Sequence, residues 1–168
     1  RNLGSLLEHG LVSPLLLAAQ DSIVYDSSAG NGMLLMGAVP ENGIANELNP
    51  DRVAALKSLG HRTTQGDATE HVPERTPDRI IINPPFGKLD GKTWVIDGTK
   101  TDLIDHAIVM KTLSALPEDG KAVLIIAAKG FEQGAPKDDL RRGESYRNER
   151  TLYDHVYDGY NVTDHFSI

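Results

Sequence analysis

The residues with the clearest chemical potential are four in a row, Asn83-Pro84-Pro85-Phe86, directly after the aliphatic residues 79–82. Two successive prolines remove two backbone donors and fix the direction of the chain, so this turn is rigid. It presents the Asn83 carboxamide oxygen, the Pro84 carbonyl oxygen and an aromatic face. The turn therefore offers two neighbouring hydrogen-bond acceptors beside an aromatic ring. A turn that only ends a strand could contain the same residues.

A second candidate is the glycine-containing turn Asp26–Gly32, which follows a short apolar segment and has the sequence DSSAGNG. Gly30 and Gly32 permit a tight turn and let a ligand approach the backbone amides closely. A dinucleotide-binding loop would have a third glycine at position 35, where this chain has Leu35. The turn therefore fits a ligand-binding loop other than a dinucleotide loop, although any strand-to-helix turn also uses glycine.

Two carboxylates follow the next two strand candidates. Glu47, next to Leu48, is placed to accept both hydroxyls of a ribose, and a charge at the start of the following helix explains it equally well. Asp67, next to Ala68, can accept a hydrogen bond from an exocyclic amine such as adenine N6, although aspartate is also common in turns. Each residue alone is weak, and their order along the chain is the stronger signal.

Strand and helix candidates alternate along the chain. Because the central strand candidates are continuous aliphatic runs, they predict a mostly parallel sheet with helices on both faces. In such sheets the ligand lies over the carboxyl ends of the strands. We therefore expect a doubly wound α/β fold in which the four candidate segments meet at one edge. Strands are expected at 22–26, 44–48, 61–66 (as a sheet edge), 79–82, 121–128 and 161–168, helices at 3–19, 33–39, 50–59, 102–116 and 144–156, and a surface insertion at 88–101.

Composition excludes several classes of protein. The chain has 168 residues, which suits one domain, and no cysteine, which removes disulfide scaffolds, zinc fingers and cysteine nucleophiles. Its six histidines never fall four residues apart, so no metal site is predicted. The apolar runs are too short to cross a membrane and the first residues do not resemble a signal peptide. We therefore expect a cytoplasmic protein with no membrane partner.

The net charge of −7 argues against broad electrostatic affinity for nucleic acid. Residues 79–150 differ from the rest, because they hold 12 basic and 11 acidic side chains. A polyanion would approach this middle stretch, although an ordinary solvated loop and helix explain it as well. The basic residues concerned are Lys129, Lys137, Arg141, Arg142, Arg147 and Arg150.

The strand ends carry DxxxGxG, Glu, GDA and NPPF in that order, and together they resemble motifs I to IV of the class I S-adenosylmethionine-dependent amino-methyltransferases, particularly the N6-adenine methyltransferases. The first motif is commonly DPSAGTG in that family, and this chain has DSSAGNG. The resemblance covers residues 23–128. It implies a Rossmann-like class I methyltransferase fold, S-adenosyl-L-methionine as cofactor, and DNA as the partner that carries the methylated adenine.

The resemblance also implies roles for individual residues. The NPPF turn would orient the target amine, with Asn83, Pro84, Pro85 and Phe86 as the catalytic group. The cofactor would have its ribose at Glu47, its adenine beside Asp67 and its amino-acid end near Asp26 and Gly30. The cofactor-binding residues implied are Asp26, Ser28, Ala29, Gly30, Asn31, Gly32, Glu47, Leu48, Asp67, Ala68 and Asn83.

The chain departs from the family in two ways: it has no separate target-recognition region of useful size, and it stops where the family's last β-hairpin would be completed. We therefore expect residues 1–168 to form a single catalytic domain that belongs to, or works beside, a larger protein supplying recognition. The first and last segments resemble methylase domains of large phage- and plasmid-borne helicase–methylase polypeptides. Cytosine N4, adenine in RNA and protein glutamine are alternative targets. A non-catalytic cofactor-binding module and a plain nucleotide-binding protein are alternative functions.

Overall fold

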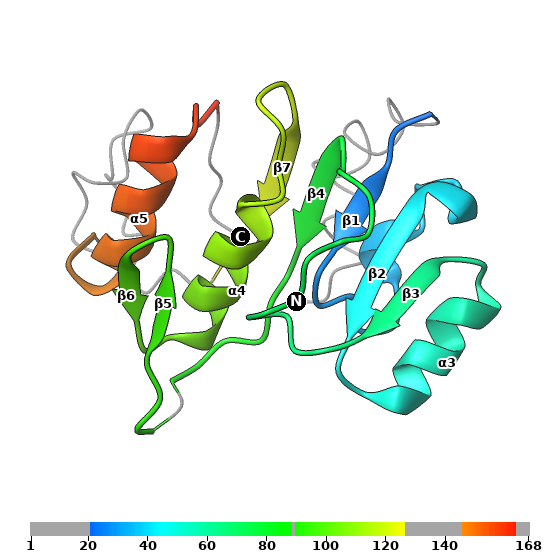
Figure 1. Ribbon diagram of the computed structural model, residues 1–168, viewed down its shortest axis with the longest axis horizontal. Coiled ribbons are helices and arrows are strands. Elements are labelled where there is room, and N and C mark those ends of the chain that lie inside the picture. Colours follow the sequence, from blue (N-terminus) through cyan, green and yellow to red (C-terminus); the bar gives the residue numbers. More distant parts are fainter. Residues whose placement is uncertain (1–20, 89, 127–145, 164–168) are drawn as a thin grey trace, which may run out of the picture.

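Five parallel strands form the central sheet of the computed structural model, which describes residues 21–88, 90–126 and 146–163. Their order across the sheet is β3-β2-β1-β4-β7 (Figure 1). Every pairing between neighbours is parallel, so the carboxyl ends lie at one edge. The strands are β1 (Val24–Asp26), β2 (Gly43–Glu47), β3 (Arg62–Gln65), β4 (Arg79–Ile82) and β7 (Lys121–Leu124).

The chain reverses its winding direction beside β1. It runs outward from β1 through β2 to β3, and then crosses back to β4 on the other side of β1. In the register between these two strands, Val24 lies opposite Arg79 and Tyr25 opposite Ile80. The carboxyl ends of β1 and β4 therefore flank the switch point, which is where open α/β sheets bind ligands.

One face of the sheet is covered by the segments that follow β1 and β2. Val24, Ala45 and Ile81 pack there against Leu35 and Leu56 in one apolar cluster. Because successive side chains of a strand point to opposite faces, the neighbours of these strand residues enter a different cluster. The elements on this face are the short 3₁₀ helices η1 (Met33–Leu35) and η2 (Pro40–Asn42) and the helix α3 (Pro50–Ser58).

The opposite face of the sheet is covered by a hairpin and two helices from the second half of the chain. Tyr25, Ile80 and Ile82 pack there with Val109 and Leu152. Helices therefore lie on both faces, and the predicted doubly wound, Rossmann-like α/β fold is confirmed. The elements on this face are α4 (Ile104–Leu113), α5 (Tyr146–Gly159), and the antiparallel hairpin of β5 (Trp94–Ile96) and β6 (Thr99–Thr101), with α5 beyond α4 and the hairpin (Figure 1).

The helix predicted from residue 50 begins where its capping residues place it. Asn49 Oδ1 accepts from the backbone N–H of Asp51 at 2.9 Å and of Arg52 at 3.2 Å. Pro50 occupies the first helical position, where a backbone N–H would have no partner inside the helix. Gly60, with φ of 88°, follows the helix and turns the chain toward β3. This start fixes the direction of the chain just after Glu47.

The helix predicted at 33–39 is wrong, because the structure has only the three-residue η1 there, followed by turns and η2. Two sequence features explain the short helix. Gly37 is a poor helix former, and Val39 precedes a proline and is extended, with φ of −63° and ψ of 129°. The apolar character of this segment reflects the burial of Leu34 and Leu35 beneath the sheet rather than a full helix.

The prediction of a surface insertion at 88–101 is partly wrong, because the hairpin in this segment contributes to the core. Trp94 and Ile96 are buried in the cluster on the α4 face, while Val95 between them is 60% exposed. Asp97 and Gly98 form the turn with φ of 46° and 80°. A two-residue Asp-Gly connection between alternating apolar residues is a strong hairpin signal, which the many lysines and glycines of this segment obscured.

Other predicted elements differ at their ends or lie outside the described residues. The predicted edge strand at 61–66 is confirmed as β3, and the predicted helix at 144–156 corresponds to α5. Residues 161–163 form no strand. The predicted segments at 3–19, 127–128 and 164–168 lie outside the described residues. Within the described ranges, no helix combines the length and apolar character needed to cross a membrane.

We expect Trp94→Ala to lower the free energy of unfolding by about 3 kcal/mol, because it removes a large side chain from the core. Val95→Ala, in the same strand, should change it by less than about 0.5 kcal/mol because Val95 is exposed. Urea denaturation followed by circular dichroism measures both. Equal stability of the two variants would show that the hairpin does not contribute to the core.

Candidate active site

The turns after β1 and β2 lie against each other at the carboxyl edge of the sheet. The backbone N–H of Gly30 donates to Glu47 Oε2 at 2.8 Å, and the N–H of Asn49 donates to Oε1 at 2.8 Å. The N–H of Ala29 donates to the carbonyl of Asn46 at 2.9 Å. Glu47 therefore lies at the glycine turn, as expected from the sequence. Each of its oxygens accepts one hydrogen bond and keeps a further lone pair, and the residue is 8% exposed.

Gly30 and Gly32 in the Asp26–Gly32 turn are required for different structural reasons. Both have left-handed backbones, with φ of 56° at Gly30 and 81° at Gly32, which strain other residues. A Cβ at Gly32 would lie 2.8 Å from Leu56 Cδ2, so this glycine also allows packing on α3. In the described part of the chain, a Cβ at Gly30 would meet no atom within 4 Å. The backbone at Gly30 is therefore open to a ligand. Of the other residues predicted here, Ser28 is half-buried, Ala29 buried and Asn31 exposed.

Asp26, the last residue of β1, is only 1% exposed. Burial raises its pKa from 3.8 to about 7, the backbone N–H of Ser28 acts in the opposite direction, and the negative charge of Glu47 raises the pKa further. The Ser28 hydrogen bond to Asp26 Oδ1 is 3.0 Å long. A cation bound near these two carboxylates would favour the ionised form of Asp26. The pair therefore favours a ligand with a positively charged group.

Asn46 joins the turns after β1 and β3, and the sequence analysis did not single it out. Its Nδ2 donates to the carbonyl of Ser27 at 2.9 Å and to the carbonyl of Gly66 at 3.0 Å. The Ser27 hydroxyl lies 2.6 Å from Thr112 Oγ1, which connects the first turn to α4. The sequence did not predict the roles of Asn46 and Ser27, because their hydrogen-bond partners are distant in sequence. The signal available in the sequence was an asparagine at the end of the otherwise apolar stretch 43–46, and the structure shows it to be fully buried.

Asp67 follows β3 and is shaped by Thr69. Its Oδ1 accepts from the Thr69 backbone N–H at 2.9 Å and from the Thr69 hydroxyl at 2.7 Å. Burial acts to raise the pKa of Asp67, but these hydrogen bonds and the charge of Lys92 outweigh it and lower the pKa. The side chain is therefore a fixed, ionised acceptor at this edge. Of its neighbours in the predicted site, Ala68 is buried and Leu48 is exposed.

The NPPF turn follows β4, the strand beside β1. Asn83 is half-buried, and its Oδ1 is buried with no hydrogen-bond partner among the residues that the structure describes. Pro84 is buried, Pro85 is exposed, and Phe86 is 52% exposed. A buried acceptor without a donor costs about 1–3 kcal/mol. The turn therefore combines an acceptor that lacks a donor with an aromatic ring open to solvent.

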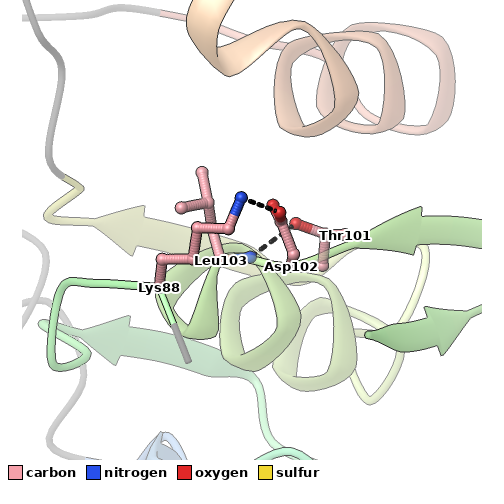
Figure 2. A network of polar contacts seen from close by, with 4 residues as sticks. All are labelled: Lys88, Thr101, Asp102 and Leu103. Carbon is pink, nitrogen blue, oxygen red and sulfur yellow. Dashed lines mark hydrogen bonds and ion pairs between the residues drawn. The ribbon is translucent and has the colours of Figure 1, made fainter. Parts of the chain in front are cut away.

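The exit of the NPPF turn is fastened to the start of α4. The N–H of Ile104 donates to the Gly87 carbonyl at 2.9 Å, and Lys88 forms an isolated antiparallel bridge with Leu103. Figure 2 shows the ion pair of Lys88 with Asp102, and the Leu103 N–H donates to Thr101 Oγ1 at 3.2 Å. These contacts bring the two ends of the 88–103 segment together and hold the turn in place.

Two surface pockets lie beside the β5–β6 hairpin. One of 290 Å³ is lined by Thr101, Asp102 and His106 with residues of β6 and α5. The other, of 680 Å³, lies between β6 and α5. Neither is lined by a residue predicted for the site. The candidate active site therefore rests on the contacts at the strand ends rather than on a pocket.

No family model and no curated protein matches this sequence. Several solved structures have a similar fold. A TehB-like S-adenosylmethionine-dependent methyltransferase from Corynebacterium glutamicum matches with a TM-score of 0.45 and 18% identity, over 67% of this chain and 60% of that one. A methyltransferase from Thiobacillus denitrificans in complex with S-adenosyl-L-homocysteine matches with 0.47 and 17%, over 73% and 48%. A sugar N-methyltransferase from a Streptoalloteichus species matches with 0.46 and 15%, over 73% and 53%. The chain thus spans less than two thirds of each of these structures.

We expect Asp26→Asn to change how stability depends on pH. Because the pKa of Asp26 is higher in the folded chain, its stabilising contribution is complete below pH 4 and is lost as the pH rises toward 7. The gap between 3.8 and about 7 corresponds to about 4 kcal/mol. In urea denaturation, Asp26→Asn should therefore gain stability over the wild type at pH 8 and little at pH 4. Asp119→Asn, at an exposed position, is the control. A constant difference between Asp26→Asn and wild type at both pH values would contradict the assignment.

Proposed function

We propose that this chain is an S-adenosylmethionine-dependent methyltransferase that methylates an exocyclic amine, with N6 of adenine in DNA as its target. The single observation that carries the proposal is the buried Asn83 Oδ1, which lacks a donor among the described residues. It follows the end of β4, the strand that pairs with β1, which is the strand followed by the Asp26–Gly32 turn. An amine N–H supplied by a substrate would satisfy this acceptor.

The residues at the edge of the sheet fit the cofactor. The open backbone at Gly30 and the carboxylate of Asp26 suit the α-ammonium group of its zwitterionic amino-acid end, and the remaining lone pairs of Glu47 suit ribose hydroxyls. Asp67 supplies a fixed acceptor for the adenine amine, and the exposed side chain of Leu48 supplies an apolar surface. When bound, S-adenosylmethionine supplies an electrophilic methyl group on a sulfonium.

The chain's own contribution is to aim the amine. An aromatic amine is a poor nucleophile because its lone pair is delocalised into the ring. Asn83 Oδ1 and the Pro84 carbonyl would accept its two hydrogens, which favours a pyramidal nitrogen with a directed lone pair. Such positioning contributes up to about 7–11 kcal/mol in well-aligned reactions. Phe86 would stack on the base, and a base in a duplex must first leave the helix. The new nitrogen–carbon bond would form as the methyl–sulfur bond breaks, and the neutral thioether of S-adenosyl-L-homocysteine would be the leaving group. The methylated nitrogen is then cationic and acidic and can lose its proton to water, so no base with a shifted pKa is needed.

Nucleic acid as the partner is part of the proposal, with recognition supplied by another domain or subunit. The net charge of −7 gives this chain little general affinity for phosphates. Two lysines near the NPPF turn are already engaged, because Lys88 pairs with Asp102 and the Lys92 ammonium lies 4.7 Å from the Trp94 ring centroid. The basic residues Lys129, Lys137, Arg141 and Arg142 lie outside the described residues. We expect weak, salt-sensitive DNA binding by this chain alone.

The direct test is methyl transfer from labelled S-adenosylmethionine to DNA, RNA and protein, followed by identification of the methylated nucleoside or amino acid. N6-methyladenine in DNA supports the full proposal. N4-methylcytosine, labelled RNA or labelled glutamine would keep the amine chemistry and change the target. Binding of S-adenosylmethionine without transfer to any of these substrates would indicate a non-catalytic module.

We expect Asn83→Ala to abolish methyl transfer while S-adenosylmethionine affinity stays within about threefold, because the Asn83 oxygen acts mainly in the transition state. Asn83→Asp should keep measurable activity, since a carboxylate can still accept from the amine. Single-turnover rates give the first effect and calorimetry the second. Near-wild-type rates in both variants would mean that the NPPF turn is only structural.

We expect Phe86→Ala to raise the Michaelis constant for DNA more than it lowers kcat, because the lost stacking is worth about 1–3 kcal/mol per base. Phe86→Tyr keeps the aromatic face and is the matched control. Phe86 is exposed, so neither variant should alter stability by more than about 0.5 kcal/mol. A loss of kcat with an unchanged Michaelis constant would place Phe86 outside base binding.

A further inference from the structure

His71, in the segment between β3 and β4, lies between two hydroxyl groups from different strands. Its Nδ1 is 2.7 Å from the hydroxyl of Tyr25 in β1, and its Nε2 is 2.8 Å from Thr64 Oγ1 in β3. Thr64 Oγ1 also lies 3.2 Å from Asn46 Oδ1. A continuous set of hydrogen bonds therefore leads from His71 to the amide that joins the turns of the candidate site.

The direction of each hydrogen bond follows from the fixed end of this network. Asn46 Nδ2 donates to two backbone carbonyls, so its amide orientation is set and Oδ1 faces Thr64. The single hydrogen of the Thr64 hydroxyl has two acceptors within reach, Asn46 Oδ1 at 3.2 Å and the Ala45 carbonyl at 3.3 Å. Because Asn46 is fully buried, its oxygen needs a donor, and the Thr64 hydroxyl supplies it. Thr64 Oγ1 must then accept from His71 Nε2–H. His71 Nδ1 consequently carries no hydrogen and accepts from the Tyr25 O–H.

The other neutral tautomer of His71 would leave a group unsatisfied at each end of this network. If His71 carried its hydrogen on Nδ1, the Thr64 hydroxyl would donate to Nε2 and Asn46 Oδ1 would lose its donor. The Tyr25 hydroxyl would accept from Nδ1, and its own hydrogen would lose the acceptor that it has on His71. The surroundings also keep the ring neutral. Burial lowers the pKa of His71, the charge of Glu74 acts in the opposite direction, and Lys111 lowers the pKa further.

We propose that His71 is a positioning residue for the candidate cofactor site at the strand ends, acting as the neutral Nε2–H tautomer through Thr64 on Asn46. With its oxygen held, the Asn46 amide keeps both hydrogens on the carbonyls of Ser27 and Gly66. These two carbonyls lie just before the parts of the turns that carry Gly30 and Asp67. The inference rests on the proposed function, because the turns that this network holds are the ones assigned to S-adenosylmethionine.

Paired substitutions separate the two nitrogens of the ring. The Nε2 of a glutamine can take the place of His71 Nε2, so His71→Gln keeps the donor to Thr64. The Oδ1 of an asparagine can take the place of Nδ1, so His71→Asn keeps only the acceptor for Tyr25. Thr64→Val removes the hydroxyl at constant shape. Its matched control is Thr63→Val, whose hydroxyl donates to the His61 carbonyl outside this network.

Calorimetric titration with S-adenosyl-L-homocysteine should show dissociation constants raised about tenfold in His71→Asn and Thr64→Val. In His71→Gln, Tyr25→Phe and Thr63→Val they should stay within about twofold of the wild type. Equal affinities in the glutamine and asparagine variants would overturn the role of His71 and leave the cofactor assignment intact. Absence of binding by the wild-type chain would instead sink the proposed function, and the candidate cofactor site with it.

The tautomer is tested without any ligand. Long-range nitrogen–proton spectra of the wild-type chain should give His71 a protonated Nε2 and an unprotonated Nδ1 at pH 7. The same spectra of Thr64→Val should show the change in Nε2 shielding that follows loss of its acceptor. A protonated Nδ1 in the wild type would refute the network, whatever the affinities of the variants.

Discussion

Parallel strands that end together leave backbone groups which the next strand cannot pair, and satisfying those groups shapes this edge of the molecule. Two adjacent side chains of β2 meet that need. The Asn46 amide donates to the carbonyls of Ser27 and Gly66, and Glu47 accepts from the amides of Gly30 and Asn49. A hydrocarbon side chain in place of Asn46 would remove the donor that it gives to the carbonyls of the buried Ser27 and the half-buried Gly66. The shape of the turns therefore depends on polar groups supplied by the central part of the sheet.

The need to pair these backbone amides also accounts for the position of Glu47, one of the two carboxylates at this edge of the sheet. Glu47 is held in place by two backbone amides, while Asp26 stands on the neighbouring strand with burial and the charge of Glu47 both raising its pKa. The raised pKa means that ionising Asp26 costs folding free energy at neutral pH. A bound cation would offset that cost, so the same carboxylates would both destabilise the ligand-free chain and favour a ligand with a cationic group.

The sequence was sufficient to predict the sheet, its parallel strands and the start of α3, because aliphatic runs and the Asn49-Pro50 cap are local signals. It also predicted that Glu47 lies near Gly30, since parallel strands bring their ends together. It was insufficient for η1, where Gly37 and Pro40 shorten the helix, and for the hairpin, whose Trp94 is recognised as core only once α4 is in place. Asn46, Ser27, Thr64 and His71 were missed because hydrogen bonds between distant segments leave no spacing pattern in the sequence.

The antiparallel bridge between Lys88 and Leu103 affects which residues of the chain can change without disturbing the fold. The chain leaves the sheet after the NPPF turn and returns at the start of α4 through the same point. Part of the segment between them is fixed, because Trp94 and Ile96 are core residues, whereas residues 90–93 and the Asp97–Gly98 turn are exposed. The entropy of a loop that is closed at its base grows only slowly with its length. Evolution or engineering can therefore vary the exposed residues of this segment, provided that Trp94 and Ile96 stay packed.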